Sequence, residues 1–249
     1  MKFLRSVLFV ILILNCRQAA LFSQELNLVL EPGIGSYAMK DLKSFNNTIL
    51  SLVIFDAKIT DDFPDYWNNK LLLQYTAKRY LSFGITCSYQ STGARISRVD
   101  YSGEYQFDTR IRAFSPGVVA EFYLPFNKLR FSFSNEAGIE FTKLRLSEYL
   151  KIKSVSEEEG NSFTSKNWYY EPTVKLSYPV KFLRLGIATG YLMDLKKGTF
   201  QNPDLNNSNI KLSNGKAITS DWSGLRIRLS LSVNLLQFKS TDLPADPTN

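Results

Sequence analysis

The chain has no histidine among its 249 residues and only two cysteines, and 21% of it is charged. Without histidine there is no Ser-His-Asp triad, no imidazole general base and no His-ligated zinc. The sequence therefore lacks the commonest acid-base group and metal ligand at neutral pH. The length is enough for one large domain with a sizeable buried core.

The N-terminal segment reads as an export signal. Two basic residues precede a nine-residue apolar run over 6–14, and small and polar residues follow at 19–23. The run is too short to span a bilayer as a helix, so we predict a signal peptide over 1–23 with cleavage after Ser23. Cys16 would instead suggest a lipoprotein, but Asn15 stands where a small residue normally precedes a lipidated cysteine.

Removal of this segment takes away three basic residues and no acids, so the formal charge falls from +7 to +4. The remainder has no cationic run of the kind that binds nucleic acid. It keeps one cysteine, Cys87, and cannot form an internal disulfide. No nucleic-acid partner is expected.

Strict alternation is the strongest signal in the chain. Segments 81–90, 129–142 and 225–235 place apolar residues at 17 of the 18 positions of one parity. A helix of 3.6 residues per turn cannot present such a pattern on one face, so these are strands. Weaker alternation over 26–37, 71–78, 116–124, 170–177 and 183–194 brings the total to eight.

The connections alternate in length. Those at 78–80, 125–128 and 178–181 are tight turns, whereas long connections lie at 38–68 and around Asp100, Glu158 and Asn206. Short turns at one end and long loops at the other are typical of an outer-membrane barrel, with turns in the periplasm and loops outside the cell. We predict an all-β fold: an eight-stranded antiparallel transmembrane β-barrel over 24–238, followed by a disordered tail over 239–249.

The first long loop contains a helical pattern. Leu42, Phe45, Ile49 and Leu52 recur at helical spacing and predict a short amphipathic helix. It would cap the barrel mouth or lie on the membrane surface. Residues 48–60 do not alternate, so a further strand pair, which would make ten strands, is not expected there.

Alternation alone does not say which row faces inward. A soluble lipocalin-like barrel, with the apolar row lining a ligand cavity, is the rival fold. The polar row favours the membrane barrel, because it is rich in Gly, Ser and Thr and suits a crowded lumen better than a solvated surface. An eight-stranded barrel is just wide enough to be filled by side chains.

Charges in the polar row balance, six acids against six bases. We predict a lumenal salt-bridge network, since buried charges persist when they are paired; an ion path is the alternative. Its members are Glu31, Glu121, Glu136, Glu140, Glu171, Asp194, Lys78, Arg130, Lys175, Arg184, Arg226 and Arg228. No sizeable pore is expected.

Aromatic residues cluster where interfacial girdles should lie. On the loop side these are Tyr66, Trp67, Tyr105, Phe107, Trp168, Tyr169, Tyr170 and Trp222, and on the turn side Tyr80, Tyr123, Phe126, Tyr178 and Phe182. The acidic clusters Asp61-Asp62 and 157–159 lack the ligand spacing of a calcium site. No metal or cofactor is expected.

Four blocks carry a resemblance: GIGSYAMKDLK at 33–43, FDAKITDDFPDYW at 55–67, STGARIS at 91–97 and DYSGEY at 100–105. The exported chain resembles the small outer-membrane barrels of the OmpA and OmpX type, and the blocks resemble an uncharacterised Bacteroidota-type barrel family. The resemblance implies a Gram-negative outer membrane, with its lipid, lipopolysaccharide and the barrel assembly machinery as partners. The chain departs from such barrels after Phe238, because eleven mostly polar residues follow the aromatic residue that often ends them.

Three functional hypotheses follow. The first is a structural barrel that displays loops for adhesion or partner binding, with Trp67, Arg95, Asp100, Tyr101 and Glu104 as surface candidates. The second is a small passive porin or specific transporter. The third is a histidine-free enzyme, with Glu136 and Glu140 as its carboxylates. The first is favoured, since familiar outer-membrane barrel enzymes resemble one another in needing a histidine.

Overall fold

The computed structural model describes residues 24–78, 80–101, 103–153, 155–203, 208–212 and 214–238. The predicted signal peptide at 1–23, with Cys16, and the predicted tail at 239–249 lie outside the described residues. Within the described part, no helix is long and apolar enough to cross a bilayer.

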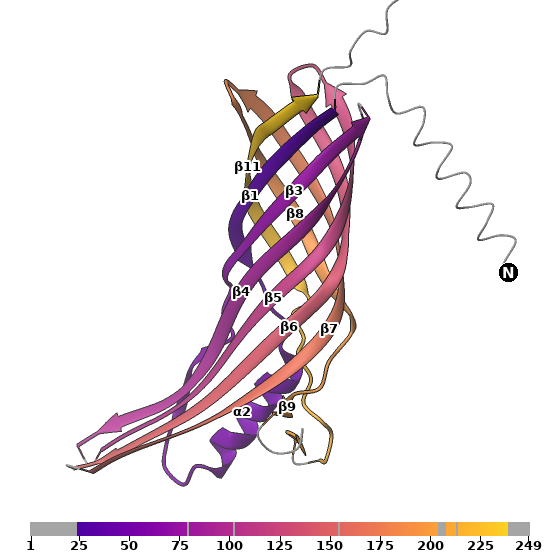
Figure 1. The fold of residues 1–249 in the computed structure, drawn as a ribbon. Coiled ribbons are helices and arrows are strands. Elements are labelled where there is room, and N and C mark those ends of the chain that lie inside the picture. The colour runs from indigo at the N-terminus through magenta and orange to yellow at the C-terminus, as the bar shows by residue number, and fades with distance from the viewer. Residues whose placement is uncertain are drawn as a thin grey trace, which may run out of the picture.

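Eight long antiparallel strands form a closed ring (Figure 1). They are β1 (Gln24–Gly35), β3 (Tyr66–Lys78), β4 (Leu81–Asp100), β5 (Gly103–Phe126), β6 (Leu129–Ile152), β7 (Val155–Val180), β8 (Leu183–Lys196) and β11 (Gly224–Phe238). Neighbours in sequence pair with one another, and β1 closes the ring by pairing with both β3 and β11. The predicted eight-stranded barrel is confirmed.

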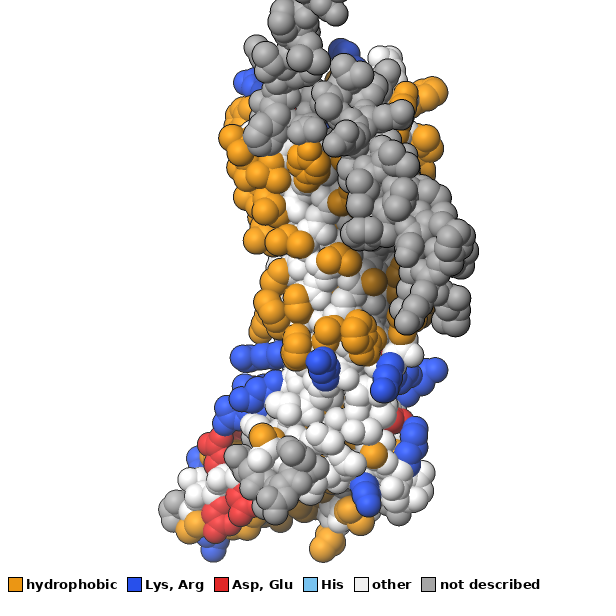
Figure 2. All heavy atoms as spheres, turned by 45° about the vertical axis from the view of Figure 1, so that its right-hand side comes forward, with side chains coloured by type: hydrophobic (Ala, Val, Ile, Leu, Met, Phe, Trp, Pro, Cys, Tyr) orange, Lys and Arg blue, Asp and Glu red, His pale blue; other side chains and the backbone are white. Residues whose placement is uncertain are grey.

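The apolar row of each strand faces outward. Leu30, Ile85, Phe133 and Leu229 are 45%, 62%, 42% and 61% exposed, and Figure 2 shows hydrophobic side chains covering the barrel wall. The alternate row is buried and polar, as at Ser132 and Ser134 on β6. The apolar exterior contradicts a soluble lipocalin-like barrel and is the surface that a transmembrane barrel presents to lipid.

Two of the predicted long loops are strands instead. β4 and β5 stay paired until Asp100 faces Gly103, and β6 and β7 until Ile152 faces Val155. The four strands therefore run past the barrel as a curved arm, at the lower left of Figure 1. The β4–β5 hairpin ends between Asp100 and Gly103 and the β6–β7 hairpin between Ile152 and Val155, so Glu158 lies within β7.

The arm inverts the pattern of the barrel. On β6 the outward residues change from Phe141 to Lys143 and Arg145, and the inward residues change to Leu144 and Leu146. The outward row meets lipid along the barrel and water along the arm, so apolar side chains move to the inward row where lipid ends. In the sequence, the exchange of apolar and polar rows breaks the alternation in the same way as the end of a strand does. The predicted strands were therefore too short, and their outer parts were predicted to be loops.

The inner face of the arm has its own apolar core outside the barrel. It is covered by α2 (Lys40–Leu52) and by the connection between β8 and β11, which contains β9 (Gln201–Asn202) and β10 (Ser208–Asn209). Leu42, Phe107, Leu144, Phe200 and Trp222 belong to this core. We call the arm together with these covering segments the head.

The predicted helix is present as α2, and it packs inside the head rather than on the membrane. The ring of Phe45 lies 6.4 Å from that of Phe107, and Asn46 accepts a hydrogen bond of 2.8 Å from Thr109. The first loop adds one short strand, β2 (Lys58–Asp62), which pairs with the arm part of β4 and lies outside the ring, so the ring keeps the predicted eight strands.

Candidate functional site

A charged cluster fills the centre of the lumen. Lys70 Nζ lies 2.6 Å from Glu136 Oε2 and 2.8 Å from Glu171 Oε1, and Arg228 Nη1 lies 2.5 Å from Glu171 Oε1. All four side chains are at most 3% exposed. They come from β3, β6, β7 and β11, so the cluster ties together strands from around the ring.

Amides extend this cluster toward the head. Asn68 accepts from Arg228 and donates to Gln90 at 3.1 Å, and Gln90 donates to Glu140 at 2.6 Å. Arg226 also donates to Gln90 at 3.1 Å. Glu140 therefore has no direct ion pair in the described part of the chain, and amide dipoles link its charge to the arginines.

An aromatic side chain crosses the lumen above two paired glycines. Tyr169 donates a hydrogen bond of 2.7 Å to Glu136. Gly117 and Gly138 face each other across β5 and β6, and a Cβ on either would lie within 3 Å of the Tyr169 side chain. The two glycines are needed there because the tyrosine lies against their backbones.

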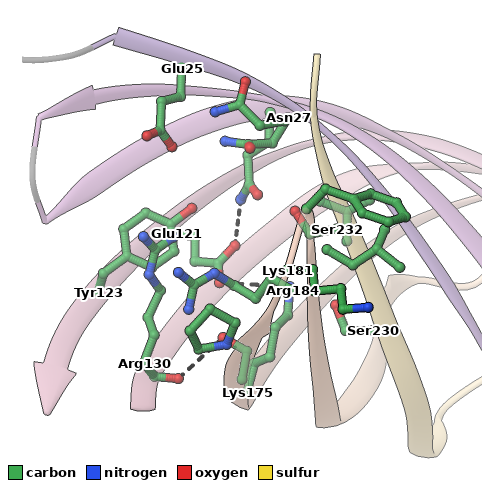
Figure 3. Close-up of a pocket in the computed structure, with 17 residues that line it drawn as sticks. Glu25, Asn27, Glu121, Tyr123, Arg130, Lys175, Lys181, Arg184, Ser230 and Ser232 are labelled. Carbon is green, nitrogen blue, oxygen red and sulfur yellow. Dashed lines mark hydrogen bonds and ion pairs between the residues drawn. The ribbon is translucent and has the colours of Figure 1, made fainter. Parts of the chain in front are cut away.

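A second polar cluster lies toward the turn end. Lys175 Nζ lies 2.7 Å from Glu31 and 3.6 Å from Glu121, which also accepts a hydrogen bond from Gln74. Gln74, Glu121 and Lys175 border a cavity of about 210 Å³ that Arg130 and Arg184 also line (Figure 3). We call this cavity the turn-side vestibule.

The predicted network residues thus fall into different surroundings. Glu31, Glu121, Glu136, Glu171, Lys175 and Arg228 take part in ion pairs. Arg226 bonds backbone carbonyls and Gln90, Asp194 accepts from the Trp222 backbone at 2.6 Å, and the Arg130 guanidinium lies 4.5 Å from the Tyr123 ring centre. Arg184 borders the vestibule, and the side chain of Lys78 lies outside the described atoms.

Sequence reasoning missed Lys70, the residue at the centre of the network. The predicted strand began at Leu71, whereas β3 begins at Tyr66. Lys70 has the same parity as Leu72 and Gln74, and all three are buried. Extending the alternation by a single residue toward the N-terminus would have placed it in the lumen.

The surface candidates do not gather in one place. Trp67 is exposed at the barrel rim, whereas Asp100, Tyr101 and Glu104 lie at the tip of the arm. Arg95 lies midway along the arm. Asp100, Tyr101 and Glu104 line one open cavity of about 360 Å³ with Phe55 and Arg98, but Trp67 and Arg95 lie outside it.

Arg95 pairs across the arm with Asp108. Its Nε and Nη2 donate to the two carboxylate oxygens at 2.7 and 2.9 Å, and Arg110 and Gln106 also donate to Asp108. Burial by itself would raise the pKa of Asp108, but these donors and the Arg95 charge hold it below its ordinary value. The carboxylate fastens the outer half of the β4–β5 hairpin.

Only part of the predicted girdles faces outward. Tyr66, Trp67, Trp168, Tyr80, Phe126, Tyr178 and Phe182 are exposed, whereas Tyr105, Phe107, Tyr123, Tyr169 and Trp222 are buried. Trp222 donates a hydrogen bond of 2.9 Å to Thr142 and meets Tyr37 edge to face. These buried rings have the inward parity or lie in the head.

Neither acidic cluster gathers into a metal site. Asp61, Asp62 and residues 157–159 are exposed. In the described part of the chain no three His, Cys, Asp or Glu side chains are grouped to hold an ion. The two carboxylates of the enzyme hypothesis are enclosed, since Glu136 accepts from Lys70, Thr86 and Tyr169 and Glu140 from Gln90 and Ser115.

No protein-family model matches the chain, and no curated protein sequence does so significantly. Among solved structures, the chain is similar to neisserial surface protein A, with 7% identity, 84% of this chain and 96% of that chain covered, and a TM-score of 0.44. It is similar to the attachment invasion locus protein Ail of Yersinia pestis, with 11% identity, 88% and 99% coverage and a TM-score of 0.34. For the outer-membrane protein OprG of Pseudomonas aeruginosa the values are 8%, 87%, 98% and 0.43.

These scores are low, and the assignment comes from the chain's own geometry. The ring of strands is closed, its lumen is polar and its exterior is apolar. In a bilayer only such a closed sheet satisfies every backbone hydrogen bond without a helix. The chain has the architecture of a small outer-membrane β-barrel of the OmpA and OmpX type, the class found in Gram-negative outer membranes.

Proposed function

We propose that this barrel has no open pore and acts as a membrane anchor that holds the head outside the cell for adhesion or partner binding. The observation that carries the first half is the ion pair between Lys70 and Glu171, which joins strands on opposite sides of the ring. Glu136, Tyr169 and Arg228 complete this layer. A solute would have to displace buried, paired charges to pass.

The head supports the second half of the proposal. Its core extends beyond the barrel from Tyr169 in the lumen, and its tip exposes Ile54, Val99, Tyr101, Ile152 and Val155. Apolar side chains in water, on a stiff arm, are the kind of surface that a protein partner covers. Lipopolysaccharide around the barrel and the barrel assembly machinery are the further partners that we propose for an outer-membrane protein.

Conductance tests the closed lumen. Purified protein in planar bilayers should give no stable single-channel steps, and liposomes that contain it should not swell in small sugars. Stable channels would support the porin hypothesis instead. Hydrolysis of phospholipid or lipid A, lost on Glu136→Gln, would support the enzyme hypothesis.

Truncation tests the role of the head. Ala94 faces Thr109 and Leu146 faces Asn161, so residues 94–109 and 146–161 can each be replaced by a short Gly-Ser turn without a change in register. Cells that display the full chain should adhere to surfaces coated with matrix glycoproteins or sulfated glycans, and cells with the truncated chain should not. Heat-modifiable gel migration shows whether the full and the truncated barrels are both folded. If they are, equal adhesion by the two kinds of cell would contradict a role for the head.

A further inference from the structure

A band of basic side chains encircles part of the barrel directly beyond the apolar exterior. Figure 2 shows Lys and Arg side chains where the hydrophobic wall gives way to the head. On β5 and β6, the outward residues beyond the apolar wall are Arg112 and Arg110, and Lys143 and Arg145. The chain therefore places cations at the level where lipid headgroups begin.

Cross-strand register makes this band unfavourable on its own. Arg112 faces Lys143 across β5 and β6, whereas Arg110, which faces Arg145, is itself paired with Asp108 at 3.0 Å. Like charges directly opposite one another destabilise a sheet. An anion bound from outside would remove this repulsion.

Next to these pairs the surface is hollowed. A groove of about 640 Å³ lies where β7 leaves β8 and pairs with β9. Its lining includes Lys143, Lys166, Lys196 and Lys197, together with hydroxyl and amide side chains and no acidic residue. We call it the lysine groove.

Three of the four lysines have free charges. Lys197 Nζ lies 2.5 Å from Asp221 Oδ2. For Lys143, Lys166 and Lys196, no ion pair occurs within the residues that the structure describes. The groove thus presents a net charge of three beside Thr and Ser hydroxyls, which suits the oxygens of a phosphate group.

The groove also borders the membrane. Phe141 lines it and is 47% exposed, and Lys166 Nζ lies 5.5 Å from the centre of the Phe141 ring. Trp168, 52% exposed, faces Lys196 across β7 and β8. A ligand here can have its acyl chains against the aromatic wall and its charged headgroup against the lysines.

We infer that the lysine groove binds a phosphate of a phosphorylated glycolipid headgroup in the leaflet that surrounds the barrel. The ligand is lipid rather than free phosphate, because the groove adjoins the apolar wall. This inference deepens the proposed function, since it depends on the head lying outside an outer membrane. It gives the anchor a fixed position in the leaflet and assigns residues to the contact with lipopolysaccharide.

The test is the stabilisation of folded protein in detergent by added lipid. Diphosphorylated lipid A should raise the temperature of the heat-induced gel shift, whereas dephosphorylated lipid A and millimolar inorganic phosphate should have little effect. The triple variant Lys143→Gln, Lys166→Gln, Lys196→Gln should bind lipid A at least about tenfold more weakly, since each surface lysine contributes on the order of 1 kcal/mol toward an anionic lipid. The control Lys40→Gln, Lys58→Gln, Lys211→Gln removes the same charge from exposed head positions outside the groove and should bind as the wild type does.

Each outcome is informative. Equal binding by the groove variant and the wild type would overturn the inference, as would equal stabilisation by inorganic phosphate. If the triple variant does not fold, the single variants Lys166→Gln and Lys166→Arg replace it. Lys166→Gln should weaken lipid A binding, and Lys166→Arg, which keeps the charge, should not. A wild-type chain that migrates identically boiled and unboiled would refute the membrane barrel itself. That result differs from a folded barrel whose lysine groove does not bind lipid A, so the two hypotheses are tested separately.

Discussion

Lys70 on β3 and Glu171 on β7 lie 2.8 Å apart, although three strands separate β3 from β7 in either direction around the ring. The pair therefore spans the barrel. Two buried charges cost free energy to remove from water, and Glu136 and Arg228 offset that cost by completing the layer. This layer of ion pairs crosses the lumen and holds its walls together.

Removal of Lys70 should destabilise the barrel strongly. Lys70→Met leaves Glu136 and Glu171 buried with one cation fewer, and breaking a buried pair in this way costs roughly 3–5 kcal/mol. Urea unfolding in detergent, followed by gel mobility, measures the change. Lys128→Met, at an exposed turn position, should have little effect, and equal midpoints for the two variants would contradict a structural role for the network.

Gly138→Ala should disturb the lumen layer through Tyr169. The added Cβ would lie 2.2 Å from Pro116 O and 2.8 Å from the Tyr169 ring, so the backbone or the ring must move. Overpacking of this kind costs about 1–3 kcal/mol. The matched change Gly160→Ala meets its nearest atom at 3.4 Å and should be tolerated; thermal gel shifts that do not distinguish the two variants would argue against the close packing.

The outer arm should loosen in acid. The pKa of Asp108 is held below its ordinary value of 3.8 in the folded arm, so its contribution is present above that value and is lost as the pH falls through the lowered pKa. Hydrogen exchange over 90–112, corrected for intrinsic rates, should rise between pH 6 and pH 3, while exchange over 129–138 in the barrel should not. Asp108→Asn should exchange fast at both values, and a variant that keeps the wild-type pH dependence would assign the effect to another group.

The three tryptophans should report two environments. Trp222 is fully buried in the head core, whereas Trp67 and Trp168 are 58% and 52% exposed at the membrane rim. In chains that keep one tryptophan each, brominated lipids should quench Trp168 and Trp67, and neither brominated lipids nor acrylamide should quench Trp222. If brominated lipids do quench Trp222, this residue lies at the membrane interface, as the sequence predicted, and not in the head core.

The barrel was predictable because lipid imposes a simple rule on the sequence. Apolar residues at every second position of 225–235, and at all but Asn135 in the same row of 129–142, establish strands and their lipid face, and the tight turns establish antiparallel order. The arm was not predictable by the same rule, because at Lys143 and Leu144 the surroundings change from lipid to water and the two rows exchange character.

The charged site shows the same division. Parity places Glu171 and Arg228 in the lumen, but it does not say which partner each will meet. That choice depends on closure of the ring, which brings Lys70 on β3 within reach of β7.

The sequence by itself therefore determined the strands, their outward face and the polar character of the lumen. Each of these follows from the alternation of neighbouring residues, because lipid surrounds the whole barrel wall. Only the tertiary structure decided that Lys70 pairs with Glu171 across the lumen and that Trp222 lies in a head core. It also decided that Lys143, Lys166 and Lys196 share one groove, because these contacts join residues far apart in the chain and depend on how the sheet curves.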